Sequence, residues 1–241
     1  GYGYALAKEN ICSMADIYTT NRGERSKYFG PEGPWQLTGN GISYTNLEAD
    51  FAHKRIIVEK KVEALLKLKA PQGPKEGVRE VVTGYVKGYN RWLKQTGVAK
   101  IQDTTCRGAA WVKPINELDV YRRFYELGTL GSAGAAVDGT ANASPPAMMA
   151  SAGDSGDTVE NPTAADFAKI NDLNPDIGSN AVSLGSESTS TGKGMLFGNP
   201  HFPWSGSERF FEAQLTIPGK MNVSGASLLG APVVLIGHTQ N

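Results

Sequence analysis

The sequence predicts an α+β fold in which the helices come first and the strands second. Up to Leu130, apolar residues recur at three- and four-residue spacing, which is typical of amphipathic helices. From Ser179 onward, short β-like runs alternate with turns marked by Gly and Pro. Helices followed by strands suggest that the two kinds of element form separate layers.

Two helices are expected before Pro71. Residues 5–20 form the first, and Arg22-Gly23 ends it. The second begins at Asn46, a plausible N-cap, and runs to about Lys69. We expect the second helix to bury one set of side chains and expose another: Phe51, Ile57, Val58, Val62, Leu65 and Leu66 inside, and Lys54, Arg55, Lys60 and Lys61 outside.

Two further helices are predicted over residues 75–95 and 118–130. Each has an apolar face at helical spacing: Val78, Val81, Val82, Tyr85, Tyr89 and Trp92 in the first, and Val120, Tyr121, Phe124, Leu127 and Leu130 in the second. Between them, the short apolar stretch 105–112 is interpreted as a loop that leads into a strand.

The composition changes between Gly131 and Pro162. Gly, Ala, Ser, Asp and Pro dominate this stretch and aromatic residues are absent, which predicts a mobile or loosely helical segment. A short helix over 163–173, with Thr163 as its N-cap, is expected to follow. After it come five predicted strands: 181–184, 195–197, 210–217, 221–227 and 233–236.

The composition of the 241 residues is that of an ordinary globular protein, with 40% hydrophobic and 20% charged residues. Lys plus Arg and Asp plus Glu are equal at 24 each, so electrostatics give no reason to expect a nucleic acid or an anionic membrane as partner. No run of about 18 apolar residues is present, so no transmembrane helix is predicted.

The two cysteines, Cys12 and Cys106, lie far apart in the sequence and match no zinc-ligand spacing. Two buried free thiols and one disulfide are both compatible with this pattern. No metal or other cofactor is expected.

A specific chemistry is suggested at Gly178-Ser179, where a Ser opens an apolar, strand-like run. If the peptide bond between these residues were cut, Ser179 would carry a nucleophilic hydroxyl and a free α-amine. An α-amine titrates near pH 8 in its ordinary state, so part of it is neutral and can accept the hydroxyl proton. Ser179 would then hold a nucleophile and its base, whereas an uncut Gly-Ser before a strand is simply a turn.

Longer motifs extend from both sides of this position. The run Ser179-Asn180-Ala181-Val182, Gly185-Ser186 and Asn199-Pro200-His201-Phe202-Pro203-Trp204 resembles the β-chain start of the penicillin acylase family of N-terminal-nucleophile hydrolases. Within it, the acyl-homoserine-lactone and aculeacin-type acylases are the most similar. Upstream, Gly23-Glu24-Arg25-Ser26 and Tyr28-Phe29-Gly30 resemble the α-chain opening of the same family.

The resemblance implies an organisation for the whole protein. It implies a four-layer αββα fold, with a mainly helical α-chain over 1–160, a spacer over 161–178 and the β-chain start over 179–241. The long spacer would reach into the site before the cut and leave afterwards. It also implies an α/β heterodimer made from one precursor and a periplasmic or secreted location, with which a Cys12–Cys106 disulfide is consistent. Both ends of the sequence look like arbitrary cuts, so we expect a fragment.

The resemblance also assigns roles to residues of the site. Ser179 is the nucleophile, and Gly178 and Ser179 flank the autocleavage point. His201 is an orienting and polarising partner of Ser179, since lactone and lipopeptide acylases carry His there and penicillin G acylases typically Gln. Without the resemblance, we would interpret His201 as a turn residue, and Phe202 and Trp204 as residues of the hydrophobic core. With it, Phe202 and Trp204 line an apolar acyl pocket.

Other polar residues receive weaker assignments or none. Asn180 and Ser227 are candidate site residues that could equally satisfy backbone groups, and His53 and His238 receive no role. The family's oxyanion donors would lie beyond Asn241.

The function implied is that of a self-processing amide hydrolase. It would remove a medium or long fatty acyl chain from a small N-acylated amine, such as an acyl-homoserine lactone or a lipopeptide, which would make it a quorum-quenching or antibiotic-metabolising enzyme. The alternatives are a β-lactam acylase, which His201 disfavours, and a non-catalytic binding homologue that is never cut at Gly178.

Overall fold

The computed structural model describes residues 1–37, 42–130, 132, 134, 137, 141, 142 and 179–239. Gly178, the predicted helix over 163–173 and most of the small-residue segment 131–162 lie outside these residues. The described part is a mixed helix-and-sheet fold. Its α-helices precede β3, and β1 and β2 are the only strands among them in the described sequence.

Six α-helices lie in the first part of the described chain. They are α1 (Tyr2–Asn21), α2 (Arg25–Phe29), α3 (Asn46–Val58), α4 (Lys61–Leu65), α5 (Glu76–Thr96) and α6 (Glu117–Thr129). The strands are β1 (Pro34–Leu37), β2 (Ile42–Thr45), β3 (Ser179–Leu184), β4 (Met195–Pro200), β5 (Phe210–Ile217), β6 (Met221–Leu228) and β7 (Ile236–Thr239).

The main hydrophobic core lies between α1, α5 and α6. Leu6, Met14 and Tyr18 of α1 are buried against Val82, Tyr85 and Tyr89 of α5 and Val120 of α6. Gly3 allows α1 and α5 to approach closely, because a Cβ at this position would lie 2.1 Å from the backbone oxygen of Tyr85. The expected helices over 5–20, 75–95 and 118–130 are therefore confirmed, with ends shifted by a few residues.

The predicted long helix from Asn46 to Lys69 is wrong in three respects. It breaks at Lys60, which adopts a positive φ of 52°, so that α3 and α4 are separate helices. The N-cap is Thr45, whose hydroxyl accepts from the backbone of Glu48 in a capping box. The expected apolar face is also largely exposed, with Phe51 58% and Val58 77% accessible.

Three of the four buried residues of α3 are polar instead, and the fourth is Ala49. Asn46, Asp50 and His53 are each at most 8% exposed, and each has hydrogen-bond partners. Polar pairing, which hydrophobic periodicity cannot detect, therefore sets the orientation of this helix.

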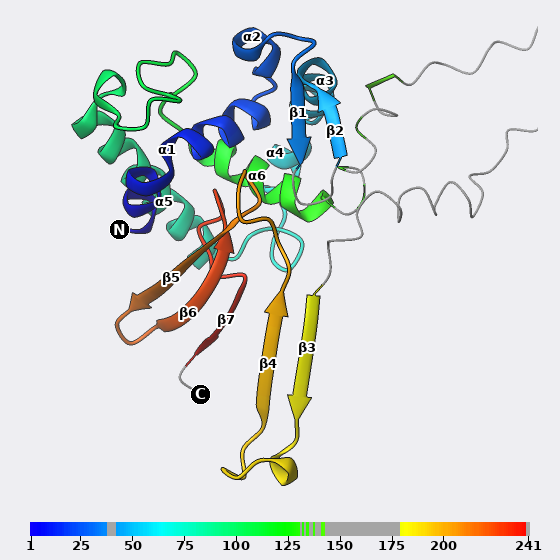
Figure 1. The fold of residues 1–241 in the computed structure, drawn as a ribbon, viewed down its shortest axis with the longest axis vertical. Coiled ribbons are helices and arrows are strands. Elements are labelled where there is room, and N and C mark those ends of the chain that lie inside the picture. The colour runs from blue at the N-terminus through cyan, green and yellow to red at the C-terminus, as the bar shows by residue number, and fades with distance from the viewer. Residues whose placement is uncertain are drawn as a thin grey trace, which may run out of the picture.

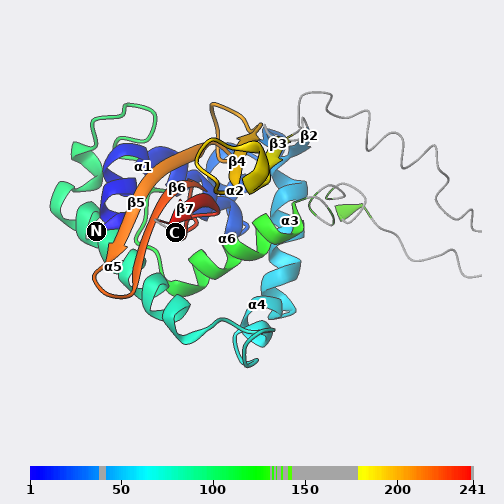
Figure 2. The same cartoon turned by 90° about the horizontal axis from the view of Figure 1, so that it is seen from below.

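Two antiparallel sheet pieces follow the helices in the sequence. β3 pairs with β4, from Ser179 opposite Pro200 to Leu184 opposite Met195, and β5, β6 and β7 form a second sheet in that order. Figure 1 shows the β3–β4 hairpin extending away from the helices beside this sheet. Viewed from below, the helices are arranged around the ends of the strands (Figure 2).

The strand predictions were mostly close. β5 matches its expected range, and β3, β4 and β6 are longer than predicted, whereas β7 begins three residues later than expected. The β1–β2 hairpin was missed, and residues 105–112 form turns without a strand.

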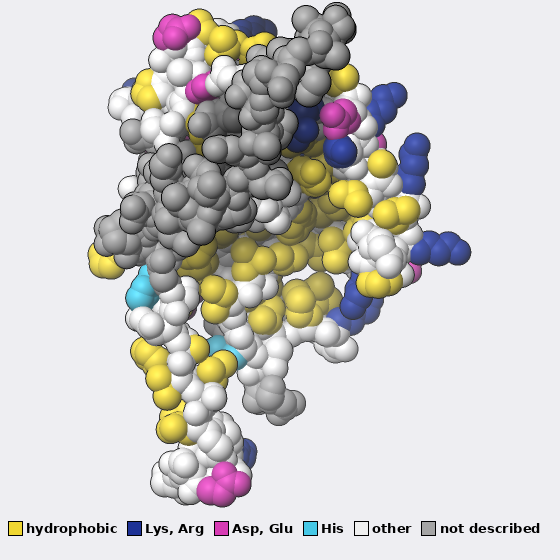
Figure 3. All heavy atoms as spheres, turned by 90° about the vertical axis from the view of Figure 1, so that its right-hand side faces the viewer, with side chains coloured by type: hydrophobic (Ala, Val, Ile, Leu, Met, Phe, Trp, Pro, Cys, Tyr) yellow, Lys and Arg dark blue, Asp and Glu magenta, His cyan; other side chains and the backbone are white. Residues whose placement is uncertain are grey.

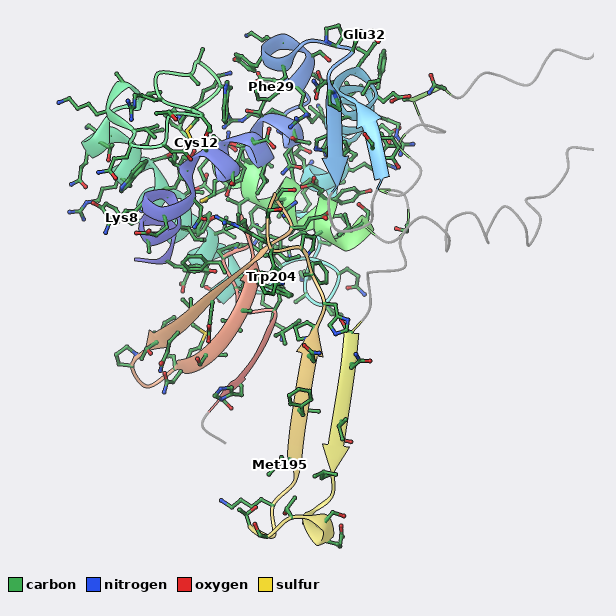
Figure 4. The ribbon with its side chains drawn as sticks, viewed as in Figure 1. Lys8, Cys12, Phe29, Glu32, Met195 and Trp204 are labelled. Carbon is green, nitrogen blue, oxygen red and sulfur yellow. A yellow bond between two sulfur atoms is a disulfide. The ribbon has the colours of Figure 1, made fainter. Side chains whose placement is uncertain are left out.

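Cys12 and Cys106 form a disulfide that joins α1 to the loop after α5. Cys106 is buried in the main core, and Cys12 packs partly buried against it (Figure 4). The sequence was compatible with two free thiols or one disulfide, and the structure contains the disulfide.

Candidate functional site

Ser179 is the first residue of β3, and the pairing of β3 with β4 places it opposite Pro200. His201, 22 residues later in the sequence, therefore lies beside it. The backbone N–H of His201 donates to Oγ of Ser179 over an N···O distance of 3.4 Å. The Ser179 residue is exposed, so its hydroxyl is accessible to another molecule.

The imidazole ring of His201 is held by two asparagines. Its Nε2 lies 3.0 Å from Nδ2 of Asn199 and 3.4 Å from Nδ2 of Asn180. Amide nitrogens are donors, so both contacts suit an Nε2 that accepts hydrogen bonds. The contact from His201 to Ser179 is thus made by the backbone, and the imidazole is oriented by its neighbours.

Asn199 is a site residue that sequence reasoning did not single out. It pairs with Asn180 across the hairpin, and Asn199 and His201 are separated by one residue. Residues two apart in an extended segment lie on the same side, and cross-strand partners lie opposite one another. The Asn-Pro-His spacing was the signal that could have revealed this cluster.

The two predicted acyl-pocket residues have different surroundings. Phe202 is half-buried, and its ring centroid lies 5.0 Å from that of Phe210. Trp204 is 97% exposed, where the strands leave the helical part (Figure 4). The described residues therefore place Phe202 against a second aromatic ring and leave Trp204 open.

The β3–β4 hairpin that carries Ser179 exposes several apolar side chains. Figure 3 shows hydrophobic side chains along the projecting hairpin. They include Val182, Leu184, Met195, Leu196 and Phe197, each at least 41% accessible. A two-stranded hairpin of this kind has little stability by itself in water.

Ser227 and the Gly23-Glu24-Arg25-Ser26 motif have structural contacts. Oγ of Ser227 is buried and donates to the carbonyl of Ala231 at 3.2 Å. The carboxylate of Asp50 accepts the backbone N–H groups of Arg25 and Ser26, each at 2.8 Å, at the start of α2. These contacts shape the turn after β6 and the start of α2.

The other two histidines lie apart from this cluster. His53 is buried beside Glu126 of α6, and His238 is exposed on β7. Within the described ranges, no group of three or more His, Cys, Asp or Glu side chains could hold a metal ion. The helices of the described part are all too short or too polar to cross a membrane.

Comparison with known proteins adds to this geometry. The chain is 38% identical to aculeacin-A acylase of Actinoplanes utahensis over 248 residues. It is 38% identical to the acyl-homoserine lactone acylase PvdQ of Pseudomonas fluorescens (strain Pf0-1) over 247 residues and 35% identical to that of Pseudomonas putida over 241 residues. Each alignment covers 100% of this chain and 29% of the relative, so the chain spans less than a third of their length.

The model of the family described as penicillin amidase matches residues 1–241. The chain therefore belongs to the penicillin amidase family.

Proposed function

We propose that Ser179 is the N-terminal nucleophile of a self-processing amide hydrolase. The hydrogen bond from the His201 backbone to Ser179 Oγ, at the first residue of a strand, carries this proposal. A backbone donor aimed at a hydroxyl oxygen stabilises the negative charge that develops there when the proton leaves. Membership of the penicillin amidase family and relatives named as acylases support the same reaction class.

The first reaction is the cut before Ser179. Oγ of Ser179 attacks the carbonyl carbon of Gly178, and the C–N bond of the peptide breaks as the acyl group moves to oxygen. Water then hydrolyses this ester, which leaves a carboxylate on Gly178 and a free α-amine on Ser179. The products are the two chains of an α/β heterodimer, and the mature fold is the four-layer αββα sandwich.

The second reaction uses the new amine as the base. It accepts the Oγ proton while Oγ attacks the amide carbonyl of the substrate, and the departing amine takes up a proton as the C–N bond breaks. Water then releases the fatty acid from the acyl-enzyme. The backbone N–H of His201 donates to Oγ, while Asn180 and Asn199 orient the imidazole ring of the same residue.

The substrate that we propose is an N-acylated amine with a medium or long fatty chain. The half-buried Phe202 and the exposed Trp204 follow His201 by one and three residues and supply apolar surface. Each buried methylene of an acyl chain contributes about 0.8 kcal/mol. An acyl-homoserine lactone or a lipopeptide fits this description, and several relatives are named acyl-homoserine lactone acylase. The Cys12–Cys106 disulfide supports an oxidising location, periplasmic or secreted.

The proposal is tested in the full-length protein with Ser179→Ala and Ser183→Ala. Ser183 is the matched control, because it is exposed on the same strand and pairs with Leu196, away from His201. We expect Ser179→Ala to remain a single uncut chain that releases no fatty acid from dodecanoyl-homoserine lactone. Ser183→Ala should be cut and should hydrolyse within about twofold of the parent.

Two outcomes would count against this function. Cleavage before residue 179 in the alanine variant would refute self-processing by the hydroxyl. Faster hydrolysis of a phenylacetyl β-lactam than of the lactone would favour a β-lactam acylase instead.

A further inference from the structure

The buried face of α6 carries three charged residues, and each contacts a different part of the molecule. Asp119, Arg123 and Glu126 lie four and three residues apart, which places them on one side of the helix. Asp119 accepts two hydrogen bonds from Arg22 next to α1, at 2.9 and 2.6 Å. Glu126 lies 3.8 Å from Nε2 of His53 on α3.

Arg123, between these two, reaches the segments next to β5 and β6. Its Nε donates to the carbonyl of Leu229 at 3.0 Å and its Nη2 to the carbonyl of Ser207 at 2.8 Å. Its Nη1 donates to Glu126 at 2.8 Å, so all three guanidinium nitrogens have a partner. Arg123 is 1% exposed, and a buried charge this well paired is strongly held in place.

The two carbonyls belong to neighbouring segments at one end of the β5–β6 pair. Phe210 opposite Leu228 is the last pair of that ladder, with Ser207 just before β5 and Leu229 just after β6. The planar fork of a guanidinium can hold two such acceptors in a fixed relation. The backbone at Gly230 also lies close to the arginine, since a Cβ there would be 3.1 Å from Cγ of Arg123.

Ser207 is also the downstream end of the segment 201–207, which contains His201, Phe202 and Trp204. The upstream end of this segment is fixed by the pairing of Ser179 with Pro200. Beyond its downstream end, Glu208 is fully buried and Arg209 donates to Asn10 of α1. The path of the segment is therefore set at one end by the hairpin and at the other by contacts to the helices.

We propose that Arg123 is a positioning residue for the Ser179 site: by holding the carbonyls of Ser207 and Leu229, it fixes the segment that presents the His201 N–H to Ser179 and Phe202 to the acyl chain. The inference rests on the proposed amide hydrolysis for its catalytic consequence. Its structural content, the restraint of 201–207 by a side chain of α6, does not depend on the reaction.

The test compares Arg123→Met and Arg123→Lys with Arg22→Met in the full-length protein. Arg22 is the matched control, because it makes a two-bond ion pair with Asp119 of the same helix and bonds the Pro114 carbonyl, with no contact to the strands among the described residues. Both methionine variants break a charge pair on α6, so both should lower the melting temperature. Only the Arg123 variants remove the hold on Ser207 and Leu229.

The first measurement is hydrogen exchange of peptides that cover 201–208, made in the Ser179→Ala background so that every variant is the same uncut chain. We expect Arg123→Met to speed exchange in this segment by at least about tenfold relative to Arg22→Met. Arg123→Lys, which keeps the charge but can hold fewer acceptors, should fall between them. Equal exchange in the two methionine variants would overturn the inference.

The second measurement is kcat and KM for dodecanoyl-homoserine lactone, with Ser179 intact and rates expressed per cleaved chain. We expect kcat of Arg123→Met to fall by at least about tenfold while KM changes by less than about threefold, since the misplaced groups act on the reacting atoms. Arg22→Met should keep kcat within about twofold. An unchanged kcat per cleaved chain in Arg123→Met would equally overturn the inference.

The exchange and kinetic measurements together distinguish a failure of this inference from a failure of the proposed function. If the parent protein is neither cut at Ser179 nor able to hydrolyse the lactone, the proposed function fails, and the exchange comparison alone decides the role of Arg123. If Arg123→Met does not fold, Arg123→Lys is judged by the same two measurements against Arg22→Met.

Discussion

Phe202 is the residue expected to line the acyl pocket, and its half-buried ring packs next to Phe210. A larger or smaller apolar side chain at this position should change the space left for the acyl chain. We predict that Phe202→Leu shifts the preferred acyl chain to greater length and Phe202→Trp to shorter length. Each methylene that gains or loses burial contributes about 0.8 kcal/mol, about fourfold in kcat/KM. The measurement is kcat/KM over acyl chains of increasing length, with cleavage before Ser179 checked in parallel.

Phe29→Leu provides the control for Phe202, since Phe29 packs on Trp111 in the helical part. It should leave the acyl-length profile unchanged. Identical profiles for the parent, Phe202→Leu and Phe202→Trp would show that Phe202 is an ordinary packing residue.

Glu126 is the residue whose environment makes the clearest prediction about pH. Burial raises the pKa of its carboxyl, but the Arg123 guanidinium and His53 outweigh that effect and bring the pKa to about 2, below the ordinary value of 4.5. A lowered folded pKa stabilises the fold above about pH 4.5, and this stabilisation is lost as the pH falls through about 2. Its size is at most about 3 kcal/mol.

Comparing the parent with Glu126→Gln isolates this contribution, because the other carboxylates are shared. The difference in the free energy of unfolding, measured with urea, should be largest at pH 7 and should shrink between about pH 4.5 and pH 2. A difference that stays constant over this range would mean that Glu126 does not titrate as its contacts predict.

Among the larger elements, the disulfide connects α1 to the loop after α5 across a sequence separation of 94. Closing a loop of this size restrains the unfolded chain, which typically stabilises a protein by about 2–5 kcal/mol. We therefore predict that the double variant Cys12→Ala/Cys106→Ala unfolds at a clearly lower urea concentration than the parent. Adding reductant should lower the midpoint of the parent and leave the variant unchanged; equal midpoints without reductant would contradict a stabilising bond.

The elements also show what local sequence patterns can predict. α5 and α6 were predicted almost to their ends, since their apolar residues face the core at regular spacing. α3 was predicted with the wrong side inward, because Asn46, Asp50 and His53 are buried by pairing with residues far away in the sequence. Periodicity cannot detect a polar buried face whose partners lie on other elements.

At the scale of the whole molecule, the site depends on contacts between distant parts of the chain. The resemblance to a known family pointed to Ser179 and His201, and the β3–β4 pairing brings them together. Arg123 was not identified, because its acceptors lie 84 and 106 residues later, and only the fold reveals that α6 faces them. Asn199 was likewise missed, because its role depends on which residue it faces across the hairpin.

The most direct test of the central claim is the intact mass of the full-length protein, purified without protease, together with the N-terminal sequence of each chain. If Ser179 is the nucleophile that frees its own amine, two chains should be found and the second should begin Ser-Asn-Ala-Val-Ser. A single uncut chain that hydrolyses acyl amides, or a second chain that begins at any residue other than Ser179, would contradict the claim.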